Sequence, residues 1–97
     1  MNETKKTNNE EQKTPEINLY NELQFLAMGL SQMAWQLMGL QLGPGQKEIK
    51  KDMEQAKLAI DTVVFLVDKI SDKIDEKQKK DFQNIISDLQ INFVKQK

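Results

Sequence analysis

The 97-residue sequence contains no cysteine and no histidine. Serine–histidine triads, thiolate nucleophiles, structural zinc sites and imidazole-ligated haem each depend on one of these two side chains. Their absence excludes most enzyme mechanisms. We therefore expect a protein that is not an enzyme and that needs no cofactor and no metal.

The sequence also lacks an excess of charge of either sign. Its 14 basic residues, all lysine, balance 15 acidic residues to a net charge of -1. Such a chain does not attract phosphates over long range, and without arginine it lacks the planar fork that grips phosphates and guanine edges. We expect no nucleic-acid partner. No apolar segment behind Met1 resembles a secretory signal, so the predicted location is cytoplasmic.

The first sixteen residues hold no large apolar side chain after Met1. A segment of asparagine, glutamate, lysine, threonine and glutamine buries too little apolar surface to offset the entropy lost on ordering. Residues 1–16 are therefore predicted to form a disordered polar tail, and residues 17–97 a single helical domain.

Two segments with apolar residues spaced alternately by three and four predict the first two helices. The first covers about residues 19–41 and the second about residues 46–71. Gly43-Pro44-Gly45 separates them, because glycine permits a left-handed cap and proline cannot continue the helix. So short a turn makes the two helices antiparallel neighbours. The expected core positions are Leu19, Leu23, Leu26, Leu30, Met33, Leu37 and Leu40 in the first helix, and Ile49, Met53, Ala56, Ile60, Val63, Val67 and Ile70 in the second.

A third helix is predicted over about residues 76–95. Asp75 and Gln78 have the spacing of a capping box, which marks the start of a helix. Its apolar positions follow at helical intervals, and no convincing strand alternation occurs in the sequence. The sequence thus predicts an all-α fold, a three-helix antiparallel bundle made of a helical hairpin and a third helix. The expected core positions of the third helix are Phe82, Ile86, Leu89 and Phe93.

The first predicted helix carries a second stripe, opposite its core positions. A single bundle cannot bury both sides of a helix, and an exposed stripe about 25 Å long would be a liability in water. We expect dimerisation to complete the bundle, with the stripe meeting its own copy across a twofold axis in a homodimer or higher oligomer. The stripe consists of Phe25, Met28, Gln32, Trp35, Gly39 and Leu42.

The function predicted from this stripe is a non-catalytic protein–protein interaction or structural module that self-associates through its first helix. Gly39 and Ala34 would let helices approach closely, and Gln32 and Gln36 would form hydrogen bonds across the interface. An unknown protein partner remains an alternative to a second copy.

Two further alternatives use the same part of the chain. Phe25, Met28 and Trp35 could bind an apolar ligand, a lipid or a membrane surface. Residues 23–46 are 24 residues without charge, long enough to span a bilayer. Glutamine and serine side chains on several sides of this segment disfavour a transmembrane span. Association with the membrane surface is therefore favoured over a span.

Charged clusters elsewhere have structural explanations. Lys57 and Asp61 are four residues apart, as in an ion pair on the solvated edge of a helix. Three aspartates lie near the end of the second helix, but lysines are interleaved with them and no calcium-loop pattern is present, so no metal site is predicted. The three lysines near the start of the third helix lack an aromatic platform for nucleic acid. The aspartates are Asp68, Asp72 and Asp75, and the lysines are Lys77, Lys79 and Lys80.

A diffuse pattern of residues extends from Glu22 to Val94. It comprises Phe25, Leu30, Gln32, Ala34, residues 37–39, Ala59-Ile60-Asp61, Leu66, Lys69, Ile74, Leu89 and Val94. In these residues the chain resembles a small bacterial family catalogued as domain of unknown function 1844. The resemblance implies a short, mostly helical protein without an assigned activity, cofactor or catalytic residue.

The chain departs from the family pattern at two places. The pattern has threonine and then Gly-Asn where this sequence has Ile70 and Asp72-Lys73, and it has arginine and tyrosine near Gln90 and Phe93. These departures remove polar positions that a shared surface site would use.

Overall fold

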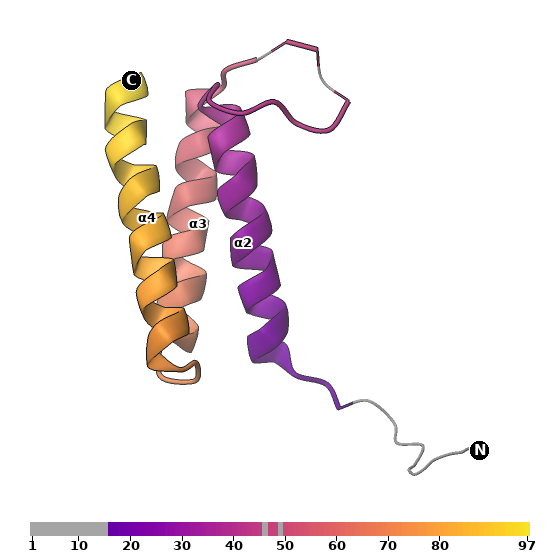
Figure 1. Ribbon diagram of the computed structural model, residues 1–97, viewed down its shortest axis with the longest axis vertical. Coiled ribbons are helices and arrows are strands. Elements are labelled where there is room, and N and C mark those ends of the chain that lie inside the picture. The colour runs from indigo at the N-terminus through magenta and orange to yellow at the C-terminus, as the bar shows by residue number, and fades with distance from the viewer. Residues whose placement is uncertain (1–15, 46, 49) are drawn as a thin grey trace, which may run out of the picture.

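The computed structural model describes residues 16–45, 47–48 and 50–97. Its helices are α2 (Leu19–Leu37), α3 (Met53–Ile70) and α4 (Glu76–Gln96), and the described ranges contain no strand. The chain rises through α2, returns through α3 and rises again through α4 (Figure 1). The prediction of an all-α fold is confirmed. The predicted polar tail, residues 1–16, lies outside the described residues except for Glu16.

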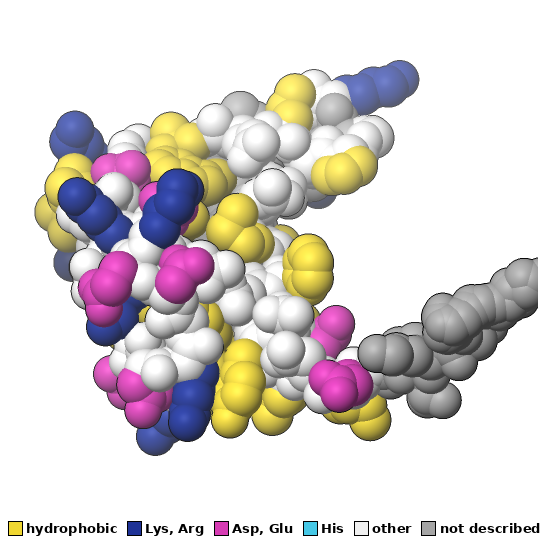
Figure 2. Space-filling view, turned by 60° about the horizontal axis from the view of Figure 1, so that its bottom comes forward, with side chains coloured by type: hydrophobic (Ala, Val, Ile, Leu, Met, Phe, Trp, Pro, Cys, Tyr) yellow, Lys and Arg dark blue, Asp and Glu magenta, His cyan; other side chains and the backbone are white. Residues whose placement is uncertain are grey.

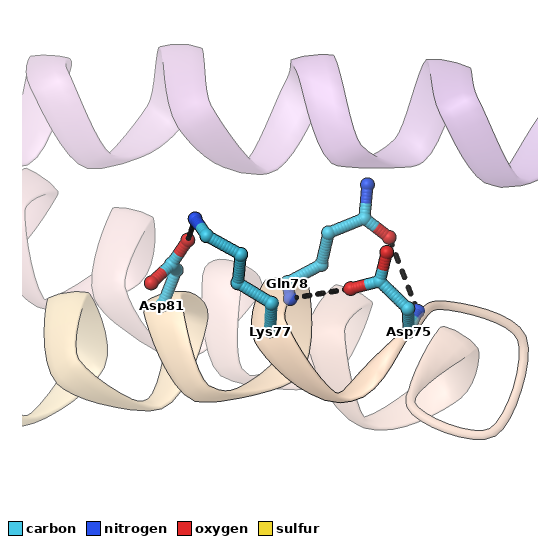
Figure 3. A network of polar contacts seen from close by, with 4 residues as sticks. All are labelled: Asp75, Lys77, Gln78 and Asp81. Carbon is cyan, nitrogen blue, oxygen red and sulfur yellow. Dashed lines mark hydrogen bonds and ion pairs between the residues drawn. The ribbon is translucent and has the colours of Figure 1, made fainter.

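Each helix begins directly after an asparagine or aspartate that caps it. The side chains of Asn18, Asp52 and Asp75 accept hydrogen bonds from backbone N–H groups in the first turns of α2, α3 and α4. At α4 the cap is reciprocal, because the Gln78 side chain accepts the Asp75 N–H at 3.1 Å while Asp75 accepts the Gln78 N–H at 2.8 Å. These bonds satisfy backbone donors that have no partner within the helix. The predicted capping box is confirmed (Figure 3).

Helix α2 ends four residues earlier than predicted, at Leu37 and not at residue 41. Gly39 has a φ of 81°, and its N–H donates to the Gln36 carbonyl at 3.0 Å. The next N–H, of Leu40, donates to the Trp35 carbonyl at 3.0 Å. This bonding is a Schellman cap, in which a residue in the left-handed conformation turns the chain away from the helix axis. Gly39 therefore ends the helix, well before the predicted turn at residues 43–45.

The described residues between α2 and α3 are not helical, and α3 begins at Met53, seven residues later than predicted. Residue 46, the predicted start of the second helix, lies outside the described residues. The N–H of Asp52 donates to the Leu37 carbonyl at 2.7 Å, which joins the end of α2 to the start of α3. The Asp52 side chain accepts the Gln55 N–H at 3.0 Å. Because Asp52 caps α3 in an extended conformation, the residues before it leave the helix. The connection is a loop with closely spaced ends that extends away from the helices (Figure 1).

Small side chains fill the contact between α2 and α3. Ala27, Ser31 and Ala34 are buried on α2, and Ala56 and Ala59 are buried on α3. The Ser31 hydroxyl donates to the Ala27 carbonyl at 2.7 Å, so its burial leaves no donor unsatisfied. Small side chains let two helix backbones approach closely. Accordingly, α2 packs mainly against α3 and much less against α4.

The seam of large apolar residues predicted for the first helix is not its buried face. Leu26 and Met33 are about half exposed, Leu19 is more exposed still, and Leu30 is only partly buried. The buried residues come one position later in the chain, which turns the buried face by about 100° around the helix. Spacing alone predicted the wrong face because both stripes step by three and four. The displaced pairs are Leu26 and Ala27, Leu30 and Ser31, Met33 and Ala34, and Leu37 and Met38.

The larger core side chains come mainly from α3 and α4. The predicted positions in these helices are buried or partly buried, apart from Ile49, which lies outside the described residues. Phe82 of α4 joins Val63 and Val67 in one apolar cluster, and Leu89 of α4 joins Ile60 in another. Helix α4 thus closes one side of the α2–α3 pair and leaves the opposite side of α2 uncovered.

Gly39→Ala should destabilise the fold by about 1 kcal/mol, because a side chain disfavours the left-handed conformation at this cap. Gly39→Asn should destabilise less, since asparagine tolerates that conformation. Urea unfolding followed by circular dichroism measures both differences. Equal stability of wild type and Gly39→Ala would show that the cap does not hold the end of α2.

Candidate interaction surface

The outer face of α2, turned away from α3, exposes large apolar side chains. Phe25 is 72% exposed, Leu26 53% and Met33 50%. Glu22 is the single charged residue between Leu19 and Leu37. Figure 2 shows lysine and acidic side chains gathered on the α4 side of the molecule, whereas α2 presents mainly hydrophobic and uncharged atoms. An apolar helix face with so little charge is typical of a surface that binds another molecule.

The structure keeps one half of the predicted stripe together and separates the other. Phe25 and Met28 are exposed on α2, as is Gln32. Trp35 is partly buried and packs against the cluster formed by Ala34, Met38 and their neighbours. Gly39 and Leu42 lie beyond the end of α2, because the Schellman cap ends the helix at Leu37. The six residues therefore do not form one continuous face of α2, and their role at an interface stays a prediction.

Sequence reasoning also missed the centre of the outer face. Leu26 and Met33 were assigned to the core, yet both are exposed, and Gly29 lies between them on the same side of the helix. A Cβ atom added at Gly29 would meet nothing within 4 Å. A glycine inside a helix costs roughly 0.5–1 kcal/mol relative to alanine. Within the single chain, no packing contact requires this glycine.

A groove of about 680 Å³ lies between the N-terminal halves of α2 and α4. Phe25 and Met28 line it from α2, and Phe82 and Ile85 line it from α4. The volume is in the range of small-molecule sites. The remaining lining residues are polar, namely Asn21, Gln24, Gln78, Asp81 and Asn84.

Both helices supply polar groups to the groove, and α4 supplies Gln78, Asp81 and Asn84. The Gln78 side-chain oxygen accepts the Asp75 N–H, which leaves its amide nitrogen pointing toward α2 (Figure 3). Asp81, the one titratable residue of the lining, is 3.2 Å from the Lys77 ammonium. The groove thus offers amide groups around an apolar floor. It can hold an apolar molecule with a polar end, but it does not bring acids and bases together.

A family model described as Domain of unknown function (DUF1844) matches residues 21–95. The chain belongs to this family. The match contains all of α3 and nearly all of α2 and α4, so the relationship concerns the helical domain as a whole. No curated protein and no solved structure matches the chain. The family description assigns no activity to this DUF1844 chain.

The charged residues of the DUF1844 chain are mainly at the surface. Asp61 forms an ion pair with Lys57 at 2.8 Å, and both side chains are well exposed, as the predicted ion-pair edge requires. Exposed pairs of this kind contribute little to stability. Within the described part of the chain, no three acidic side chains gather closely enough to hold a metal ion. In the same ranges, none of the helices is long and apolar enough to cross a membrane.

The environment of Asp52 shifts the pKa of its carboxylate. Its carboxylate accepts the Gln55 backbone N–H at 3.0 Å and the Gln55 side-chain amide at 2.8 Å. These hydrogen bonds lower the pKa of Asp52 below its ordinary value, and the bond from the Gln55 backbone has the larger effect. Asp52 also binds the Leu37 carbonyl through its N–H, so one residue both caps α3 and connects it to α2.

The cap should make stability depend on pH. Because the pKa of Asp52 is lower in the folded chain, its stabilising effect is complete above the ordinary value of 3.8 and is lost as the pH falls through the lowered pKa. Asp52→Asn keeps a capping oxygen that does not titrate. The difference in unfolding free energy between wild type and Asp52→Asn should therefore shrink from neutral pH to about pH 2, as urea titrations would measure. A difference that stays constant over this range would contradict the assigned role.

Proposed function

We propose that the protein is a non-catalytic interaction module that self-associates through α2. A second copy then covers the outer face of α2, and this contact completes the three-helix antiparallel bundle of each chain. The observation that carries this proposal is the exposure of Phe25, Leu26 and Met33 on a helix with a single charged residue. Such a face gains free energy when another apolar surface removes it from water.

The contrast between the helices supports an α2 interface. Helix α4 also exposes apolar side chains, Ile91 and Val94, but charged residues occur along its length. Helix α2 exposes large apolar side chains with Glu22 as its single charged residue. A helical domain of about eighty residues is only marginally stable alone, so burial of this face would also stabilise the fold. A non-catalytic role agrees with the groove, whose lining contains Asp81 as its one titratable group.

Met33→Glu should weaken self-association at least tenfold, because it places a charge on the outer face of α2 without touching the groove. Phe65→Glu is the matched control, since Phe65 is exposed on α3, outside this face. Analytical ultracentrifugation over a concentration series gives both dissociation constants. A wild type that stays monomeric to high micromolar concentration, or equal weakening by both substitutions, would contradict the proposal.

A second candidate function rests on the groove between α2 and α4. Its apolar floor, formed by Phe25, Met28 and neighbouring side chains, fits an apolar ligand or a lipid chain. The Gln78 amide nitrogen points toward α2 and would donate to a carbonyl or carboxylate on such a ligand (Figure 3). This candidate differs from self-association in needing α4 as well as α2.

Asn84→Trp should fill the groove and weaken binding of a long-chain fatty acid at least tenfold. Asn84 is exposed on α4, so the change does not alter the core. Isothermal titration calorimetry with a micelle-free fatty acid measures the affinity. If the wild type binds no fatty acid, or if the tryptophan variant binds it equally well, the groove is not a site for apolar chains.

A further inference from the structure

Gly29 occupies the middle of α2 on its outer face. A methyl group there would meet nothing within 4 Å in the single chain, so no intramolecular contact accounts for the glycine. Large exposed side chains surround this open position, with Leu26 before it and Met33 after it. A glycine among apolar residues lets a second helix backbone come close, because a Cβ atom would otherwise hold the helices apart.

The residues that precede Gly29 on α2 complement the residues that follow it at equal distances along the helix. Phe25 lies four residues before Gly29 and Met33 four residues after it. Glu22 lies seven residues before Gly29 and Gln36 seven residues after it. Rotation of a second copy by a twofold axis at Gly29 therefore places the Phe25 ring at the level of Met33, and the Glu22 carboxylate at the level of the Gln36 amide.

We propose that two copies of α2 cross in antiparallel fashion at Gly29, with the two glycines facing each other at the twofold axis. This inference rests on the proposed self-association and names its contact point and its direction. An aromatic ring then contacts a thioether twice, a favourable pairing. Each carboxylate likewise meets an uncharged amide that can donate a hydrogen bond to it.

Charge selects this direction over the parallel one. In a parallel pair with the same register, Glu22 would face Glu22 of the partner across an apolar interface, which is unfavourable for both carboxylates. The antiparallel pair separates these charges to opposite ends of the contact. Because α2 runs from Leu19 to Leu37, Gly29 lies near its midpoint, so this crossing overlaps nearly the whole helix in both copies.

Gly29→Ala tests the crossing because it acts in opposite directions on the chain and on the assembly. At concentrations that keep the chain monomeric, alanine should raise the midpoint of thermal unfolding by roughly 4 °C, through its helix propensity. The same substitution should weaken self-association at least tenfold, because its methyl group separates the helices. Calorimetry and analytical ultracentrifugation measure the two effects, and Ser87→Ala on the exposed side of α4 is the control for propensity alone.

The outcomes separate the crossing from self-association itself. The crossing is supported if the wild type is a dimer, Gly29→Ala raises its dissociation constant, and Ser87→Ala leaves that constant unchanged. A dimeric wild type that Gly29→Ala leaves equally tight or tighter overturns the crossing at Gly29 but not self-association through α2. A wild type that remains monomeric overturns the proposed function and the crossing with it.

Cross-linking tests the direction, and the absence of native cysteine makes each introduced thiol unique. Glu22→Cys and Gln36→Cys replace polar residues and leave the apolar contacts intact. In the antiparallel pair, a disulfide should form between the two variants when they are mixed and oxidised, and neither variant alone should cross-link efficiently. Efficient self-cross-linking of each variant, with no mixed product, would overturn the antiparallel direction.

Discussion

The close contact between α2 and α3 is the constraint on which the rest of this structure depends. Ala34 shares an apolar cluster with Ala56 and Ala59 of α3. Ala27 shares another with Val63 and Val67. On the α2 side the helices approach through residues that have little apolar surface of their own, so α2 itself contributes a limited apolar area to this contact. The larger apolar side chains of α2 must then lie to either side of this contact and not within it. What α2 exposes is a direct consequence of what it buries.

The two sides of α2 have different neighbours as a result. On one side, α4 supplies Phe82 and Leu89 to the core and leaves a groove near the start of α2. On the other side, Leu26 and Met33 have no helix of the same chain against them and are about half exposed. In the proposed assembly, a second copy of α2 would cover this second side as a fourth helix.

The parts of this fold that depend on local chemistry could be read from the sequence. The capping box of Asp75 and Gln78 needs only those two side chains and the backbone between them, and it forms as predicted. The buried face of α2 depends instead on how near α3 comes. Both the leucine stripe and the alanine stripe step by three and four, and side-chain size favoured the leucines, whereas the close approach of the helices selects the alanines.

The end of α2 and the exposed face of α2 also depend on contacts that a local sequence pattern does not reveal. Gly39 and the triplet at residues 43–45 are each able to end a helix. In this chain Gly39 ends α2, and the Asp52 N–H also reaches the Leu37 carbonyl across the loop. That bond joins residues far apart in sequence, so no local pattern announces it. The sequence places the predicted interface on α2 because that segment carries little charge, which is a property of composition. Which of its residues are exposed depends on the helix end and on the buried face, and neither follows from composition.

Phe25 is the residue at which the two candidate binding surfaces meet. It lines the groove toward α4, and it belongs to the exposed outer face of α2 that a second copy would cover. A ring shared in this way cannot be positioned independently for two binding events. If both proposed events occur, a ligand in the groove that fixes the ring would change the free energy with which a second copy contacts it. By linkage, the second copy would change the affinity for that ligand by the same factor. In a chain with no catalytic constellation among its described residues, this shared ring is the point at which ligand binding and assembly would influence each other.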